Sequence, residues 1–358
     1  MLNIEEERLR EAIDKIDQSN FKADVKGSLL HLFFDIALLV ITLLAIHHFL
    51  SNEHYVVSVL LALFAGNLFF ALFVIGHDCG HGSFSHNKTV NHLIGFILHH
   101  FLLTPYWAWK KSHQRHHQYP GNIEKDESLV PFTKDDVTSF LGVKEKNRLS
   151  FVKVRLFNLI TFLTGINFHI YTLYNPRTKC SHFMPNEVFL SRKDNRWIYF
   201  GTFVSLLFFT LLLYLTIQYP LEMLLIYWLP FMVCFHLMGL VTLMQHHDFD
   251  AKWYYSQDWN RVKGVLNTFD YRYGALNFVV SRLHHNIANF HFIHHLFPLI
   301  PHYKLEAATK SLIADLKTEY QPKRFSYLKY FRIILFCNFV DNKSAEQEVY
   351  PLRSFEKL

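Results

Sequence analysis

HFIHHLFP, residues 291–298, is the stretch of this 358-residue chain that decides how the rest is interpreted. On a helix, positions i, i+3 and i+4 share one face, so His291, His294 and His295 can direct their imidazoles at one point. Taken alone, the stretch predicts only a possible metal site.

Two upstream segments repeat this arrangement: HDCGH at 77–81 and HQRHH at 113–117. A zinc ion takes about four ligands in a structural site and three protein ligands plus water in a catalytic site. Eight imidazoles therefore indicate two metal ions, although imidazole suits zinc, copper, iron and nickel alike. The eight candidate ligands are His77, His81, His113, His116, His117, His291, His294 and His295.

A further pair, His246 and His247, follows the last long apolar stretch. We expect one of the pair, His246, to face the metal site. His285, six residues before His291, is a candidate ligand or a hydrogen-bond partner of a ligand, and His247 is a candidate partner of the same kind.

Three carboxylates near the histidine clusters are candidates to orient the ligands. Asp78, Glu124 and Asp126 could accept hydrogen bonds from imidazole N–H groups, as carboxylates around metal sites commonly do. A solvated charged loop is an equally good interpretation of Glu124 and Asp126.

The remaining histidines have a plainer interpretation, because a histidine near a membrane surface is usually a polar tip in the headgroup region. This interpretation applies to His31, His47, His48, His54, His86, His92, His99, His100, His169, His182 and His236.

The composition indicates a membrane protein, since 51% of the residues are hydrophobic and 17% aromatic. The four cysteines form no CxxC pair, which argues against a disulfide framework or a thiolate metal site. No basic stretch interleaves with aromatics, so no nucleic-acid partner is expected. The apolar sequence starts only near residue 29 without a basic leader, so no cleavable signal peptide is expected.

Four stretches are long enough to cross a bilayer, which requires about 20 apolar residues. They are residues 29–50, 55–76, 197–218 and 223–244, and they form two predicted hairpins. The tight connections within the hairpins contain no Lys or Arg, whereas the segment before the first hairpin and the segment between the two are rich in both. The positive-inside rule places both termini and the central segment in the cytosol.

Two other apolar stretches, 92–109 and 156–174, are not expected to cross. A single crossing between the first two histidine clusters would put them on opposite sides of the membrane, where they could not share a centre. We interpret both stretches as re-entrant or interfacial, and residues 327–340 as another interfacial helix.

The predicted fold is an all-α integral-membrane domain. Four transmembrane helices in two hairpins carry a cytosolic helical cap that holds a histidine-rich di-metal site. Along the single domain we expect an amphipathic segment (1–27), the first hairpin (29–76), the first two clusters with interfacial helices (77–196), the second hairpin (197–244) and the cap with the third cluster (245–358).

Four motifs resemble the integral-membrane fatty acid desaturases with three histidine boxes. They are HDCGHGSFS (77–85), KSHQRHHQYPGNIEKDES (111–128), MQHHDFD (244–250) and HHNIANFHFIHHLFPLIPHYKLEAAT (284–309). The resemblance runs from about residue 29 to 308 and is to the methyl-end Δ12 and ω-3 enzymes. Asp in the first box followed by GSFS favours the ω-3 side. Front-end enzymes differ, since they usually carry Gln where His291 stands and often a fused cytochrome b5 domain.

The resemblance implies a di-iron centre bound by the eight box histidines, with His246 as an addition. It also implies an O2-dependent reaction that removes two hydrogens from neighbouring CH2 groups of a fatty acyl lipid or acyl-CoA. The products are a cis double bond and water. The site would lie on the cytosolic face of the endoplasmic reticulum in a eukaryote or of the inner membrane in a bacterium.

Electrons would come from a separate protein, cytochrome b5 or ferredoxin. Such donors tend to be acidic, so Lys110, Lys111 and Arg115 beside the second box are a candidate docking patch.

Other functions stay open on the sequence alone. A hydroxylase, acetylenase or conjugase could use the same scaffold. A metal transporter is disfavoured because residues 55–76 contain no charged residue that could serve an ion path. An HExxH metalloprotease motif is absent.

Overall fold

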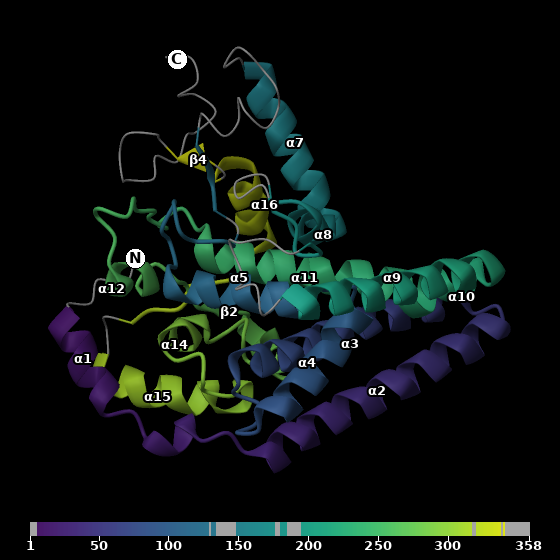
Figure 1. The fold of residues 1–358 in the computed structure, drawn as a ribbon, viewed down its shortest axis with the longest axis horizontal. Coiled ribbons are helices and arrows are strands. Elements are labelled where there is room, and N and C mark those ends of the chain that lie inside the picture. The colour runs from purple at the N-terminus through teal and green to yellow at the C-terminus, as the bar shows by residue number, and fades with distance from the viewer. Residues whose placement is uncertain are drawn as a thin grey trace.

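The computed structural model describes residues 6–128, 130–133, 148–175, 180–184, 195–316, 320–337 and 339–340. Much of the basic central segment, residues 134–147, lies outside them. The described chain is mostly helical (Figure 1). Four of its helices are long and apolar enough to cross a membrane, which confirms the prediction of a membrane protein. They are α2 (Val25–Ser51), α3 (Tyr55–His81), α9 (Asn195–Gln218) and the continuous helix Pro220–His246, composed of α10 (Pro220–Met223), the π-helical turn η2 (Leu224–Trp228) and α11 (Leu229–His246).

Of these four helices, α3 is the central one. It packs against both α2 and α11. Of its most apolar 18-residue stretch, 67% is buried, whereas the corresponding share for α2 is 22%. Contact with α11 is close at Gly66, where an added Cβ would lie 2.4 Å from Val233 Cβ. The exposed apolar side chains of α2, such as Phe33 and Leu44, instead form a surface suited to lipid.

The two apolar stretches that were not expected to cross are both broken. The first is divided between α4 (Lys88–Phe101) and α5 (Tyr106–Gln118). The second is divided between α7 (Arg148–Thr164) and α8 (Ile166–Leu173), which meet at an angle of 108°. Gly165 makes this bend with φ +75°, and a Cβ there would lie 2.6 Å from the His236 backbone nitrogen. Neither stretch is a straight spanning helix.

Shorter elements gather at one end of the long helices, on the left of Figure 1. Two parallel strand pairs join segments distant in sequence: β1 (Phe132–Thr133) with β4 (Phe339–Val340), and β2 (Tyr271–Arg272) with β3 (Lys323–Arg324). The other short helices of the described chain are α1 (Glu6–Asp14), η1 (Gln18–Phe21), α12 (Arg261–Val265), η3 (Gly274–Leu276), α13 (Asn277–Leu283), α14 (His291–Leu296), η4 (His302–Lys304), α15 (Leu305–Leu316) and α16 (Tyr327–Phe336).

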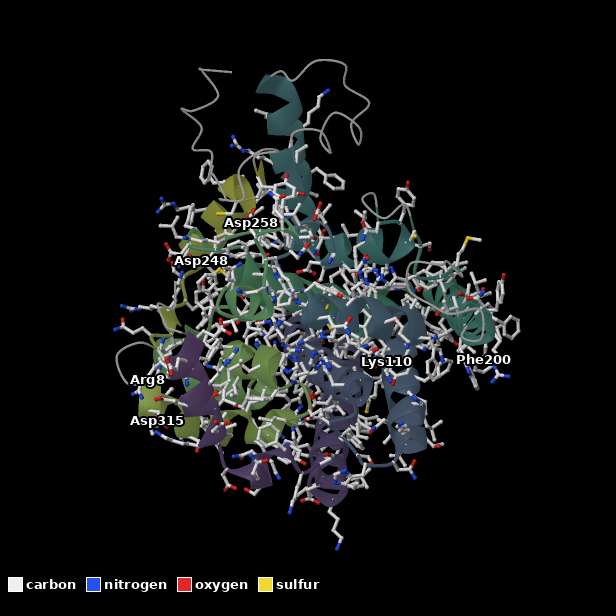
Figure 2. The ribbon with its side chains drawn as sticks, turned by 60° about the vertical axis from the view of Figure 1, so that its left-hand side comes forward. Arg8, Lys110, Phe200, Asp248, Asp258 and Asp315 are labelled. Carbon is white, nitrogen blue, oxygen red and sulfur yellow. The ribbon has the colours of Figure 1, made fainter. Side chains whose placement is uncertain are left out.

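The N-terminal helix α1 docks onto α15. Its apolar face buries Leu9 and Ala12. At the polar edge, Arg8 donates a hydrogen bond to the Asp315 carbonyl oxygen at 2.8 Å (Figure 2). The Lys15 ammonium lies 2.9 Å from the Asp315 carboxylate. The amphipathic pattern near the N-terminus thus packs on the protein's own C-terminal elements.

Candidate metal centre

Four helices deliver the predicted ligands to one region. His77 and His81 lie in the last two turns of α3, and α11 ends at His246. The second box occupies the C-terminal half of α5, and the third box forms most of α14. Helical spacing places the members of each box on a common face, and the packing of the four helices turns these faces toward each other.

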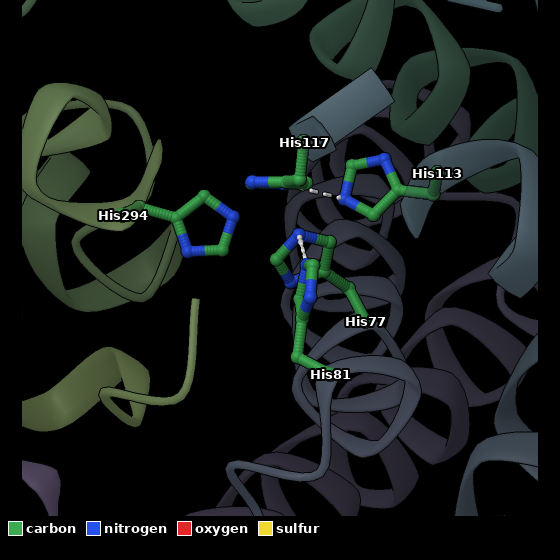
Figure 3. Close-up of side chains that lie close together, drawn as sticks. All are labelled: His77, His81, His113, His117 and His294. Atoms are coloured by element: carbon green, nitrogen blue, oxygen red, sulfur yellow. Dashed lines mark hydrogen bonds between the residues drawn. The ribbon is translucent and has the colours of Figure 1, made fainter. Parts of the chain in front are cut away.

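Five histidines form the first group, which we call the five-histidine group. One ring nitrogen of each lies within 4.8 Å of the others (Figure 3). The Nε2 atoms of His77 and His81 are 3.2 Å apart, as are those of His113 and His117. Two nitrogens bound to one tetrahedral zinc at its usual bond length lie about 3.3 Å apart, so these pairs already have ligand spacing. The members are His77, His81, His113, His117 and His294.

The other predicted ligands form a neighbouring four-histidine group of His116, His246, His291 and His295. One ring nitrogen each of His116, His246 and His295 lies within 4.8 Å of the other two. The Nε2 atom of His246 is 3.3 Å from that of His116 and 2.8 Å from that of His291. The two groups adjoin, since the His117 and His295 rings stack with centroids 4.1 Å apart.

The chemistry of both groups fits metal ions. Both ring nitrogens of His294 and both of His295 are buried and have no hydrogen-bond partner among the described residues, which is uncommon for buried polar atoms. Burial, and then the proximity of other imidazoles, lowers the pKa of His113, His117, His291, His294 and His295 well below the usual value. These rings are therefore neutral, which is the form that binds metals.

The residues that the sequence predicts to orient the ligands make different contacts in the structure. The His116 ring donates through Nδ1 to the Asp126 carboxylate at 2.7 Å, which leaves Nε2 free to face the four-histidine group. Glu124 instead accepts a hydrogen bond from the Ser256 backbone N–H at 2.9 Å. His247 donates through Nδ1 to the Cys337 carbonyl oxygen at 3.1 Å.

Two more predicted residues, Asp78 and His285, belong to another cluster. The Asp78 carboxylate accepts a hydrogen bond from His302 Nδ1 at 2.9 Å, and its second oxygen lies 3.5 Å from His77 Nδ1. His285 donates through Nε2 to the Asp35 carboxylate at 2.5 Å. Neither His285 nor His302 is a member of the five-histidine or four-histidine group.

Sequence reasoning missed Asp270, which holds the third box in place. Its buried carboxylate accepts from the backbone N–H groups of His291 at 2.5 Å and Phe292 at 2.8 Å, at the start of α14. The Tyr320 hydroxyl donates to the other oxygen. Asp270 lies 21 residues before His291, so no helical spacing could have pointed to it.

Two approaches lead to the histidines. An apolar cavity lined by Phe70, Phe73, Phe168, Met238 and Val241 reaches His77 and His113 of one group and His116, His246 and His291 of the other. A more open cleft reaches His81 and His117 between the cationic side chains of Lys111, Arg115, Lys125 and Arg261. One approach therefore suits an apolar chain, and the other a negatively charged partner.

A bundle of membrane-length helices that gathers nine imidazoles at the end of an apolar cavity defines the class of integral-membrane proteins with a histidine-rich metal site. The sequence profile described as "Fatty acid desaturase" matches residues 53–327. The chain belongs to the fatty acid desaturase family, which confirms the resemblance seen in the sequence, and membership makes it an oxidoreductase.

Its relatives include the "Omega-3 fatty acid desaturase, endoplasmic reticulum" of Vigna radiata, 37% identical over 74% of this chain and 68% of the relative. The "sn-1 acyl-lipid omega-3 desaturase (ferredoxin)" of a Synechocystis strain is 33% identical over 94% of this chain and 89% of the relative. The "Acyl-lipid omega-3 desaturase (cytochrome b5), endoplasmic reticulum" of Arabidopsis thaliana is 38% identical over 69% of this chain and 61% of the relative.

Proposed function

We propose that this chain is an O2-dependent desaturase that introduces a cis double bond at the ω-3 position of a fatty acyl chain held in a membrane lipid. The observation that carries the proposal is the apolar cavity that reaches both histidine groups. The ω-3 position and the acyl-lipid substrate are supported by the names of the relatives.

The proposed cofactor is a pair of iron ions. The five-histidine group would hold one ion, and the four-histidine group the other. Iron bound there would supply the redox chemistry that activates O2 and removes hydrogen from a CH2 group. The proposed ligands are His77, His81, His113, His116, His117, His246, His291, His294 and His295.

The protein's own part in the reaction is to position the substrate and exclude water. The aromatic walls of the cavity, including Phe73, Trp109 and Phe168, would confine the acyl chain so that one pair of carbons lies beside the histidine groups. Holding the reacting carbons in this way makes the reaction between the acyl chain and the metal centre effectively unimolecular. The apolar lining would also keep bulk water from the reacting carbons.

A direct test of this function is product analysis in yeast that expresses the chain and is fed linoleate. We expect gas chromatography with mass spectrometry to show a new cis double bond at the ω-3 position. A His113→Ala variant should give none, because it lacks a member of the five-histidine group. Hydroxylated or triple-bonded products, or no product from membranes with iron-loaded protein, would contradict the proposal.

The proposed orientation places the clustered short elements, including the third box, in a cap on the cytosolic side. The division into two hairpins and a cap within one domain is part of the same proposal. It is supported by the lack of Lys and Arg in the turns at 51–54 and 219–222. The electron donor, cytochrome b5 or ferredoxin, would then approach from the cytosol.

We place the donor's docking surface at the basic cleft, which changes the residues that the sequence suggested. Burial lowers the pKa of Lys110 to about 8, and this residue is not among those that line the cleft. Arg115 pairs with Glu127 at 3.3 Å. The remaining cations of the cleft are Lys111, Lys125 and Arg261.

The double variant Lys111→Glu/Arg261→Glu should slow reduction of the enzyme by an acidic donor by about tenfold or more at low salt, since charge complementarity mainly sets the association rate. Bound iron should not change. Stopped-flow reduction at several ionic strengths measures the effect, which should shrink as salt rises. Lys310→Glu, at an exposed position of α15, is the control. Equal rates for the double variant and the control would place docking elsewhere.

A further inference from the structure

A third histidine cluster lies outside the two groups. It consists of His31 on α2, His285 in the turn after α13 and His302 in η4. One ring nitrogen of each lies within 4.8 Å of the others. The ring centroids of His285 and His302 are 4.1 Å apart, and those of His31 and His302 are 5.0 Å apart. A residue near the N-terminus and two that flank α14 therefore bring imidazoles to one point.

Two of the three rings are oriented as metal ligands usually are. His302 donates through Nδ1 to Asp78 at 2.9 Å, and its Nε2 is buried without a hydrogen-bond partner in the described chain. His285 donates through Nε2 to Asp35 at 2.5 Å, so its Nδ1 carries the lone pair. Histidines that bind metals typically give their other ring N–H to a carboxylate in this way, which fixes the ring and raises its basicity.

The surrounding contacts hold this arrangement in place. The Asp78 carboxylate also accepts from the His302 backbone N–H at 2.9 Å, and Arg282 lies 3.3 Å from Asp35. The backbone of His285 has φ +48°, in the left-handed region that non-glycine residues seldom adopt. Such conformations persist where surrounding contacts enforce them, often at functional sites.

We propose that His31, His285 and His302 form a third metal site, which takes a divalent ion of the zinc class. Three imidazoles and a water molecule complete a tetrahedral zinc shell. A modest closure would bring the nitrogens to the required separation of about 3.3 Å. His285 and His302 are buried, whereas His31 is half-exposed and gives the ion its access from outside.

A metal ion at this site would tie the first membrane-length helix to the segments on either side of the third box. His285 precedes α14 and His302 follows it, while His31 lies in the second turn of α2. The role is therefore structural: the ion would fix α14 relative to α2. The site uses none of the nine ligands of the proposed iron centre, so it stands independently of the proposed function.

The test is metal analysis of the full-length protein, purified in detergent and equilibrated with a series of buffered free Zn²⁺ concentrations. We expect wild type to hold one more zinc per chain than His31→Ala, with at least about a tenfold loss of affinity in the variant. His48→Ala removes an exposed imidazole from the same helix and should keep the zinc. His31→Cys should also keep it, because a thiolate can replace an imidazole at zinc.

Two outcomes would overturn the third site: equal zinc content in wild type and His31→Ala, or equal loss in His31→Ala and His48→Ala. Iron content and fatty acid products, measured on the same samples, report on the proposed function separately. Even if zinc enters the other histidine groups, the zinc content of His31→Ala should still be one ion per chain lower than that of His48→Ala.

Discussion

His294→Ala is expected to abolish double-bond formation and to remove one metal ion from the protein. His294 is the one member of the five-histidine group that comes from α14, and its ring lies 4.7 Å from the rings of both His77 and His117. Both its nitrogens are buried and lack a partner in the described chain, so an ion is the natural partner for one of them. We expect activity to fall more than about a hundredfold, because loss of an outer hydrogen bond alone costs up to that much.

Metal content and product yield on the same purified sample test this expectation. The four-histidine group should keep its ion, so metal content should fall by one ion rather than two. His236→Ala is a matched control, because His236 is a partly buried histidine of α11 that donates to the Phe162 carbonyl oxygen, away from both groups. Full metal content and full activity in His294→Ala would show that the five-histidine group is not a metal site.

The second large effect is expected for Asp126→Asn, which should lower metal affinity at the four-histidine group by about 10- to 100-fold. Asp126 accepts three hydrogen bonds: from His116 Nδ1 at 2.7 Å, from the Ser128 N–H at 3.0 Å and from the Gly121 N–H at 3.1 Å. An amide has one acceptor oxygen, so its NH2 group would face at least one of these donors. The loss of negative charge also makes His116 a weaker ligand.

Competition with a chelator, followed by metal analysis, measures the affinity of this variant. A buried N–H left without an acceptor should also lower the free energy of unfolding by about 1–3 kcal/mol. Glu124→Gln changes the same functional group two residues away, where the side chain accepts from the Ser256 N–H, and should leave metal affinity unchanged. If both variants kept wild-type affinity, Asp126 would have no part in orienting His116.

The sequence predicted the features that depend on local spacing. Membrane-length helices follow from apolar length, and the boxes follow from i, i+3 and i+4 spacing on helices. The family resemblance depends on the same motifs. These features need only the neighbours along the chain, so packing did not alter them.

Features that depend on distant pairing could not be predicted. His302 contacts Asp78 across 224 residues, and Asp270 anchors α14 through its side chain rather than through any repeat. His31 is not the headgroup histidine that the sequence predicts, because its ring stacks on Tyr303 with centroids 5.2 Å apart and faces His302. His31 has no second histidine three or four residues away on its own helix, so only the tertiary structure shows that it belongs to a cluster.

The distribution of the nine histidines over α3, α5, α11 and α14 has a consequence for biosynthesis. During translation, the first box is complete after residue 81, but His294 and His295 leave the ribosome more than 200 residues later. Neither group can surround an ion fully until α14 has been made and packed. For the proposed iron centre, metal insertion would therefore follow the synthesis of α14, and newly made protein would pass through a membrane-inserted stage without metal, in which other cellular metals would compete for the first two boxes.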